Sequence, residues 1–104
     1  DPIHPYIDIT APAGSVVKAT LDGTVIYAGW SEDSGNTIQI QHSDDIVSIY
    51  KHNEKLLKKV GDKVKAGTSI ALVGNTGEET TGTHLHFELW HQGEAVDPTK
   101  YIKF

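Results

Sequence analysis

The sequence predicts an all-β protein, and three observations lead to this fold class. β-branched residues recur in short segments of alternating polarity, which is the period-2 pattern of strands. Glycine, asparagine and aspartate gather between these segments, where tight turns require unusual backbone angles. The only helical candidate is the segment Asn53–Lys59, at most about two turns long and followed by Gly61.

The first half of the chain contains three expected strands. Ser15–Ala19 carries adjacent valines, and Thr24–Tyr27 follows the turn signal Asp22-Gly23. Thr37–Gln41 alternates isoleucine with polar residues directly after Ser34-Gly35-Asn36. These segments therefore predict consecutive antiparallel strands joined by short turns.

The second half adds three further expected strands. Ile46–Tyr50 is rich in β-branched residues, and Ser69–Val73 follows the turn Ala66-Gly67. Thr83–Trp90 alternates strictly and ends before Gln92-Gly93. We therefore expect residues 1–104 to form one all-β domain, since this length is typical of a single domain with a modest core.

Composition excludes several classes of protein. The chain has no cysteine, so it can form neither disulfides nor thiolate zinc sites. Its net charge of −5 argues against nucleic acid as a partner, because such a surface requires clustered cations. No apolar run approaches the roughly 20 residues that span a bilayer. The first residues lack the basic and apolar regions of a signal peptide, and we expect the chain to be a domain excised or processed from a longer protein.

Histidines at the two ends of the chain suggest a metal site. His84 and His86 are one residue apart, so their imidazoles project from the same face of a strand. His4 and Asp8 offer a second converging pair. Catalytic zinc typically takes three nitrogen or oxygen ligands and keeps one position open, so this pattern indicates a metallohydrolase.

Alternation places both histidine segments away from the expected core. In Thr83–Trp90 the residues Leu85, Phe87 and Leu89 form the apolar face, so the histidines occupy the spare face. In the strand that begins at Ile46, we expect the face opposite Val47 and Ile49 to leave the core. Three residues share that face: Ser48, Tyr50 and His52.

A succession of motifs resembles a known family. The motifs are DITAPAGSVVKA (8–19), DGTV (22–25), SGN (34–36), YKH (50–52), VGDKVKAG (60–67), GNTG (74–77) and TGTHLHFE (81–88). In order and spacing they resemble the lysostaphin-like (LytM-type) zinc endopeptidases of bacterial cell walls, over nearly the whole chain. The resemblance implies antiparallel sheets in a barrel-sandwich architecture, the duplicated hybrid motif, with a groove that holds the metal.

The resemblance also implies a set of site residues. His4, Asp8 and His86 would hold one zinc ion per chain, and His52 and His84 would be the catalytic histidines. Zinc would activate water and polarise the substrate carbonyl, while the two histidines would move protons. The implied activity is hydrolysis of peptide bonds in peptidoglycan stems or cross-bridges, in the periplasm, cell envelope or outside the cell. Accessory domains are possible in the full-length protein.

The chain departs from the family pattern at three places. Tyr6 stands where the family usually has glycine, and in an extended segment residues 4, 6 and 8 share a face. Either the backbone bulges there, which Pro5 permits, or the phenol partly obstructs the metal site. Thr83 replaces a common proline, and the strands that usually precede the first histidine are missing.

Other residues carry weaker signals. Glu88 follows His86 on the same face of the strand. Its carboxylate can accept an N–H from a ligand imidazole, or it can be an exposed side chain without such a role, and the sequence leaves both interpretations open. His42 and His91 lack motif context and are expected at the surface. For Asn36, a turn role and substrate contact are equally plausible. Three aromatic residues are expected in the core or at the cleft rim: Trp30, Tyr50 and Trp90.

Two alternative functions remain open from the sequence. The first is a non-catalytic wall-binding or amidase-regulating domain of the same fold, which Tyr6 makes plausible. The second is a swinging-arm carrier, because VGDKVKAG also occurs in biotinyl and lipoyl domains. A carrier requires a lysine at a hairpin tip in an acidic or methionine-flanked motif, and the chain has no methionine.

Overall fold

The computed structural model describes residues 6–74 and 84–98, and these form an antiparallel β-structure without an α-helix. The nine strands are β1 (Tyr6–Thr10), β2 (Val16–Lys18), β3 (Gly23–Ser31), β4 (Gly35–Gln41), β5 (Ile46–Leu56), β6 (Lys63–Val64), β7 (Ser69–Val73), β8 (His84–His91) and β9 (Glu94–Val96). The predicted fold class is confirmed. The described part of the chain holds no helix with the length and apolarity that a membrane crossing requires.

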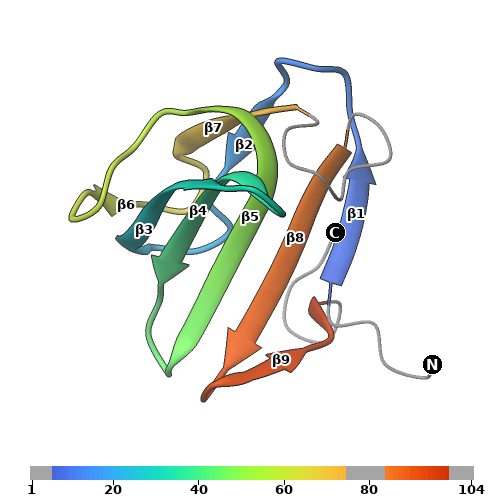
Figure 1. The fold of residues 1–104 in the computed structure, drawn as a ribbon. Helices are drawn as coiled ribbons and strands as arrows, with labels where there is room; N and C mark the ends of the chain where they lie inside the picture. The colour runs from blue at the N-terminus through green and yellow to red at the C-terminus, as the bar shows by residue number, and fades with distance from the viewer. Residues whose placement is uncertain (1–5, 75–83, 99–104) are drawn as a thin grey trace.

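The main path of the sheet runs β1-β8-β5-β4-β3-β6 (Figure 1). Strands from the two ends of the sequence are therefore neighbours, because β1 pairs with β8 along its whole length. The pairing is antiparallel and places Asp8 opposite His86 and Thr10 opposite His84. This register brings the N-terminal acidic residue to the histidine strand.

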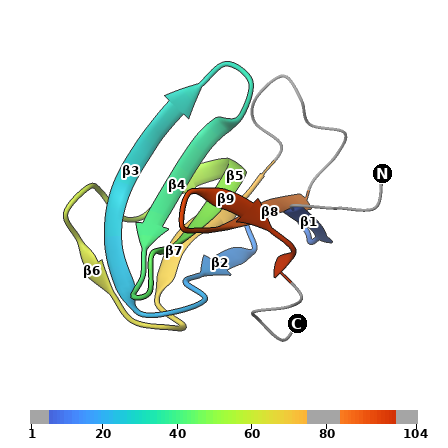
Figure 2. The same cartoon turned by 90° about the horizontal axis from the view of Figure 1, so that it is seen from below.

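Strand β5 connects two parts of the sheet. Its first half, Ile46–Lys51, pairs with β8, whereas its second half, Asn53–Leu56, pairs with β7. Strand β7 in turn pairs with β2. Seen from below, β3 and β4 curve around the side on which β2 and β7 lie (Figure 2). Strand β5 bends between its two halves (Figure 1), and the sheet therefore folds over on itself.

The core lies between these two parts of the sheet. Side chains of the long strands, such as Ile38, Tyr50 and Phe87, pack in one cluster with residues of β2 and β7, such as Val17 and Ile70. All five are at most 2% exposed. Burial of a large apolar side chain contributes about 1.5–3 kcal/mol, so this cluster is the main source of stability.

The expected helix Asn53–Lys59 is wrong. Asn53 to Leu56 continue β5, and the Leu57 N–H donates to the Ile70 carbonyl, 2.9 Å away. The helix-favouring lysines of this segment are outweighed by pairing with β7, since tertiary contacts commonly override local propensity. Strands β1, β6 and β9 were not expected either, because they are short edge or hairpin strands with little periodicity.

Candidate functional site

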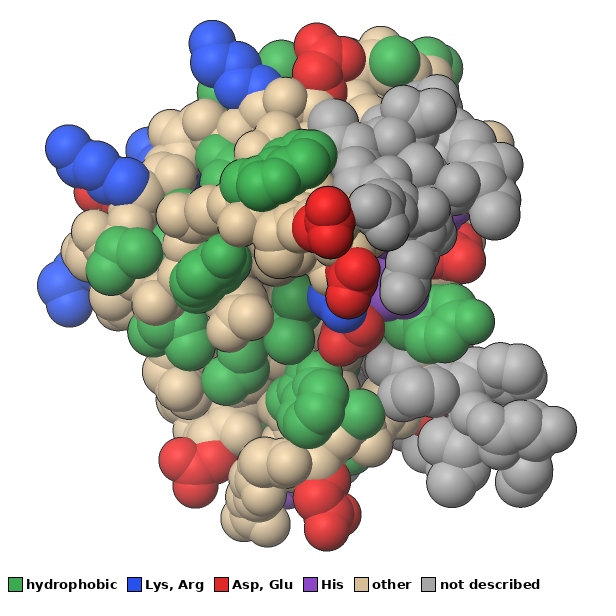
Figure 3. Space-filling view, viewed as in Figure 1, with side chains coloured by type: hydrophobic (Ala, Val, Ile, Leu, Met, Phe, Trp, Pro, Cys, Tyr) green, Lys and Arg blue, Asp and Glu red, His purple; other side chains and the backbone are tan. Residues whose placement is uncertain are grey.

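A polar cleft lies over the junction of β1, β8 and β5. Its volume is about 450 Å³, and the described residues that line it are Tyr6, Asp8, Ser34, Lys51, His52, His84, His86 and Glu88. Figure 3 shows acidic, basic and histidine atoms close together on the β8 and β1 side of the viewed face. Four of the five sequence-predicted site residues therefore line one cleft. The fifth, His4, lies outside the described residues.

Asp8 is the meeting point of the two β8 histidines. Its Oδ1 atom is 3.1 Å from His86 Nδ1 and 3.5 Å from His84 Nε2. The histidine side chains are 16% and 14% exposed, and the Asp8 side chain is 46% exposed. The alternation predicted for β8 is confirmed, because Phe87 and Leu89 are buried in the core beneath these imidazoles.

His52 reaches the cleft by a route that the sequence did not reveal. The face that we expected to leave the core is buried, since Ser48 and Tyr50 are at most 1% exposed. The pairing of β4 with β5 shifts register near His52, where the backbone adopts a left-handed φ of 63°. This irregularity breaks the alternation, as a β-bulge does.

The backbone of His52 is held by the β3–β4 turn. Its N–H donates to the Ser34 carbonyl at 2.8 Å. The His52 ring lies edge-on to both cleft histidines, with centroid distances of 6.3 Å to His84 and 5.7 Å to His86. Three imidazoles therefore border the same space.

Asn36 has a structural role in this irregular region. Its side-chain amide donates to the carbonyls of Asn53 and Glu54, each at 3.1 Å, while Asn53 donates back to the Asn36 carbonyl at 3.0 Å. Of the two roles that the sequence left open, these contacts favour the turn. They hold β4 to β5 directly beside His52.

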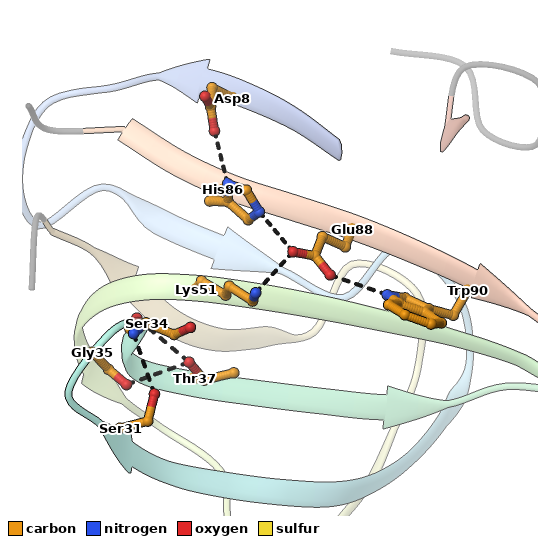
Figure 4. A network of polar contacts seen from close by, with 9 residues as sticks. All are labelled: Asp8, Ser31, Ser34, Gly35, Thr37, Lys51, His86, Glu88 and Trp90. Carbon is orange, nitrogen blue, oxygen red and sulfur yellow. Dashed lines mark hydrogen bonds and ion pairs between the residues drawn. The ribbon is translucent and has the colours of Figure 1, made fainter. Parts of the chain in front are cut away.

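Glu88 is the centre of a polar network behind His86 (Figure 4). One carboxylate oxygen is 2.8 Å from both His86 Nε2 and Lys51 Nζ, and the other accepts from Trp90 Nε1 at 3.0 Å. Burial opposes ionisation of this carboxyl, but the contacts with its three partners outweigh burial and lower its pKa to about 2. Glu88 therefore supports His86 rather than facing solvent, and it is only 15% exposed.

Lys51 is a site residue that the sequence analysis did not identify. It pairs directly with His86 across β5 and β8 and is itself 26% exposed. Its position between Tyr50 and His52 in the YKH motif was the available signal. The sequence did not indicate a partner for its charge, because Glu88 lies 37 positions further along the chain.

Tyr6 lies against a predicted metal ligand. Its ring stacks on the His86 imidazole with a centroid distance of 4.6 Å and an interplanar angle of 23°. Pairing with β8 runs without a register shift from Tyr6 to Thr10, so the described part of β1 has no bulge. The phenol covers the face of the imidazole, whereas the lone pair of an unprotonated Nδ1 lies in the plane of the ring.

The structure corrects the expected surface position of His42. This residue is 6% exposed, and its ring atoms lie 2.7 Å from the Asp22 carbonyl oxygen and 2.7 Å from Ser48 Oγ. Ser48 Oγ in turn lies 2.9 Å from the Tyr50 hydroxyl. Burial lowers the pKa of His42 more than Asp22 raises it. A satisfied polar network thus explains how an imidazole is accommodated here.

The described residues do not by themselves form a complete metal site. No group of three histidine, aspartate or glutamate side chains within 6–74 and 84–98 meets the geometry for holding a metal ion. The predicted ligand set includes His4, which lies outside these ranges. Asp8 and His86 are the two members whose geometry is described, and they face each other across 3.1 Å.

Comparison with known proteins places the chain in a family. The model of peptidase family M23 matches residues 2–98. The murein hydrolase activator NlpD of Escherichia coli is 44% identical over 97 residues, which is 92% of this chain and 25% of that protein. A lipoprotein NlpD of Yersinia enterocolitica is 42% identical over 91% of this chain and 97% of its own length. The chain thus spans about a quarter of the length of the murein hydrolase activators NlpD that it matches.

Solved structures give the same result. The catalytic domain of lysostaphin from Staphylococcus simulans superposes with a TM-score of 0.88 at 36% identity, covering 97% of this chain and 80% of that domain. A zinc-containing peptidase from Vibrio cholerae superposes with a TM-score of 0.86 at 40% identity, covering 90% of this chain and 29% of the other. The family model and these superpositions agree, and the chain belongs to peptidase family M23.

Proposed function

We propose that this domain is a zinc-dependent endopeptidase that hydrolyses peptide bonds in peptidoglycan. His4, Asp8 and His86 would hold one zinc ion, and His52 and His84 would serve as the acid and base. The observation that carries the proposal is the convergence of Asp8 and three imidazoles on one cleft.

The chemistry of the described donors fits zinc. Histidine nitrogens and carboxylate oxygens bind zinc at about 2.0–2.2 Å, so two such ligands of one tetrahedral ion lie roughly 3.3–3.6 Å apart. His86 Nδ1 and Asp8 Oδ1 are 3.1 Å apart, so a separation by about 0.2 Å would bring them to this spacing. The similarity to a zinc-containing peptidase supports the same metal.

The cleft side chains would divide the work of amide hydrolysis. When bound, zinc supplies Lewis acidity, which polarises a carbonyl and lowers the pKa of water to about 7. His52 and His84 border the same space and have ring nitrogens with which to take a proton from water and return it to the leaving amine. No described glutamate occupies the open side of the cleft, since Glu88 is engaged behind His86.

The names of the relatives support a peptidoglycan substrate and an envelope location. Relatives are named murein hydrolase activators, lipoproteins and antimicrobial peptidases. We therefore propose that this domain acts in the cell envelope or outside the cell, within a longer protein with accessory domains. A cleft of this size accommodates a short peptide of small residues.

A second candidate is a non-catalytic regulator of another wall enzyme. The name murein hydrolase activator, carried by relatives that are 44% identical, favours it. Tyr6, stacked on His86, is one of the departures from the family pattern and lines this cleft. Membership of family M23 leaves no support for the carrier alternative.

The decisive experiment digests purified peptidoglycan with and without a chelator and analyses the released fragments by mass spectrometry. The proposal expects chelator-sensitive release and about one zinc per chain by plasma emission spectrometry. His86→Ala should become substoichiometric in zinc. His52→Ala and His84→Ala should keep the metal and lose about 10²–10⁴-fold in turnover.

The digestion, repeated with a separate wall amidase, tests the alternative that the domain is a non-catalytic regulator. A protein that releases no fragments alone, with or without added zinc, but increases the activity of a separate wall amidase would contradict the endopeptidase. Loss of zinc in His52→Ala or His84→Ala would instead show that the roles of the histidines have been assigned wrongly.

A further inference from the structure

The Glu88 carboxylate lies on the far side of the His86 ring from Asp8 (Figure 4). His86 is therefore held between two carboxylates, with Nδ1 3.1 Å from Asp8 Oδ1 and Nε2 2.8 Å from Glu88 Oε2. The two contacts differ in setting, because the Asp8 side chain is 46% exposed and that of Glu88 only 15%. The tighter and more buried contact is the one to Glu88.

A carboxylate can only accept hydrogen bonds, so the contact with Glu88 assigns a proton to His86 Nε2. A neutral imidazole carries one proton, and Nδ1 is then left with its lone pair. That lone pair points toward Asp8 Oδ1, which is also an acceptor. Two acceptors that face each other at this distance form a favourable arrangement when a cation lies between them.

Two further donors fix Glu88 in place. Lys51 Nζ contacts the same oxygen as His86, at 2.8 Å, and Trp90 Nε1 donates to the other oxygen at 3.0 Å. Lys51 is the direct cross-strand neighbour of His86, and Trp90 lies on the same face of β8 as Glu88. With both oxygens engaged, the carboxylate cannot rotate without losing a hydrogen bond.

We infer that Glu88, held by Lys51 and Trp90, is a positioning residue that keeps the neutral His86 protonated on Nε2 and directs its Nδ1 lone pair to the metal. The inference rests on the proposed function for the identity of the ion. It concerns the proton on His86 itself, which is measured without metal and without activity. Neighbouring carboxylates commonly orient ligand imidazoles in this way.

The test compares the wild-type domain with Glu88→Gln. A glutamine offers one acceptor and one donor group in place of two acceptor oxygens. The amide is uncharged, so Asp8, with Oδ1 at 3.1 Å from Nδ1, is then the one carboxylate among the described residues that still contacts the ring. A carboxylate is a stronger acceptor than an amide, so the imidazole proton shifts toward Nδ1, where Asp8 accepts it.

The primary measurement is the tautomer of His86 from two-bond ¹⁵N–¹H correlation spectra of the zinc-free protein, recorded at alkaline pH. The second is zinc affinity, by competition of Zn²⁺ with a chromophoric chelator. We expect Nε2–H in the wild type, a shift toward Nδ1–H in Glu88→Gln, and a loss of zinc affinity of about 10–100-fold. Glu94→Gln, which removes an exposed carboxylate from the adjacent β9, is the matched control and should change neither.

Milder variants retain the carboxylate if Glu88→Gln does not fold. Trp90→Phe removes one donor and Lys51→Met another, so each should weaken zinc binding by less than the loss of Glu88. Wild-type His86 with its proton on Nδ1 would overturn the inference. An unchanged His86 tautomer and an unchanged zinc affinity in Glu88→Gln would also overturn it. If Glu88→Gln is unfolded, the same result in both Trp90→Phe and Lys51→Met would overturn it.

Failure of the proposed function gives a different result. If the wild type binds no zinc, the metalloenzyme is contradicted, while the tautomer shift still reports whether Glu88 positions His86. If the wild type binds zinc and Glu88→Gln behaves like Glu94→Gln, only the positioning role fails.

Discussion

Single residues determine the shape of this cleft, and Tyr6 is the clearest case. The sequence left open whether its phenol obstructs the metal position or is displaced by a bulge. The structure contains no bulge in the described part of β1, and the ring lies on the face of His86. The phenol therefore narrows the cleft without lying in the direction of the Nδ1 lone pair.

This position predicts the effect of restoring the family residue. Tyr6→Gly should change zinc affinity by less than about threefold, roughly 0.7 kcal/mol, because the phenol lies on the face of His86 and leaves the Nδ1 direction free. Tyr6→Phe, which preserves the ring, should match the wild type. Zinc titration against a chelator measures both. A gain in affinity of about tenfold, 1.4 kcal/mol, in Tyr6→Gly alone would show that the phenol obstructs the metal.

At the scale of the elements, the irregular part of β5 turns a core strand into a cleft strand. The left-handed backbone at His52 costs an ordinary residue roughly 1–2 kcal/mol, which the surrounding contacts with Ser34 and the Asn36–Asn53 pair must offset. Such local strain is typical of functional sites. Here it delivers an imidazole to the cleft.

The strain can be measured with two variants that both remove the imidazole. His52→Gly should be more stable than His52→Ala by about 1 kcal/mol, because glycine adopts a positive φ without penalty. In an ordinary strand the order is the reverse. Urea unfolding followed by circular dichroism gives the two free energies. Greater stability of His52→Ala would show that the backbone at this position is not left-handed in solution.

The buried network of β4 and β5 predicts a pH dependence of stability. The pKa of His42 is lowered from 6.5, chiefly by burial, so the folded state prefers the neutral ring. The stability that this preference contributes is complete above the unfolded pKa of about 6.5 and is lost as the pH falls below it. His42→Gln should therefore lose less stability than the wild type between pH 7.5 and 5.

Denaturant unfolding at the two pH values measures this difference. The comparison is between the two pH-dependent losses, since glutamine also changes the packing at both pH values. An equal loss in the variant and the wild type would show that His42 does not titrate with folding.

At the scale of the whole molecule, the site joins the two ends of the described chain. Strand β1 contributes Asp8, and β8 contributes His84 and His86. Loop closure between distant segments costs conformational entropy. The pairing of β1 with β8 has already closed this loop, so a metal ion that bridges the two strands does not bear that cost again. A metal that bridges these strands should therefore stabilise the entire fold.

Zinc is thus expected to raise the unfolding temperature. At a hundredfold excess over Kd, a ligand that binds only the folded state stabilises it by about 2.7 kcal/mol, which corresponds to at least about 10 °C for a domain of this size. Asp8→Asn should abolish most of this rise, whereas Asp33→Asn, in the exposed β3–β4 turn, should preserve it. Differential scanning fluorimetry with zinc and with chelator measures the shift. An equal rise in Asp8→Asn would exclude Asp8 as a ligand.

Local residue order was enough to predict the strand class, the β8 alternation and the family, because period-2 polarity and ordered motifs do not depend on tertiary contacts. The motif pattern also predicted that Asp8, His84 and His86 are neighbours. The remaining features arise from packing between distant segments. Pairing with β7 made Asn53–Leu56 a strand, and the left-handed backbone at His52 reversed the face expected from alternation. Burial of His42 and the contact of Lys51 with Glu88 depend on which strands lie side by side, and strand order arises only when distant segments pack together.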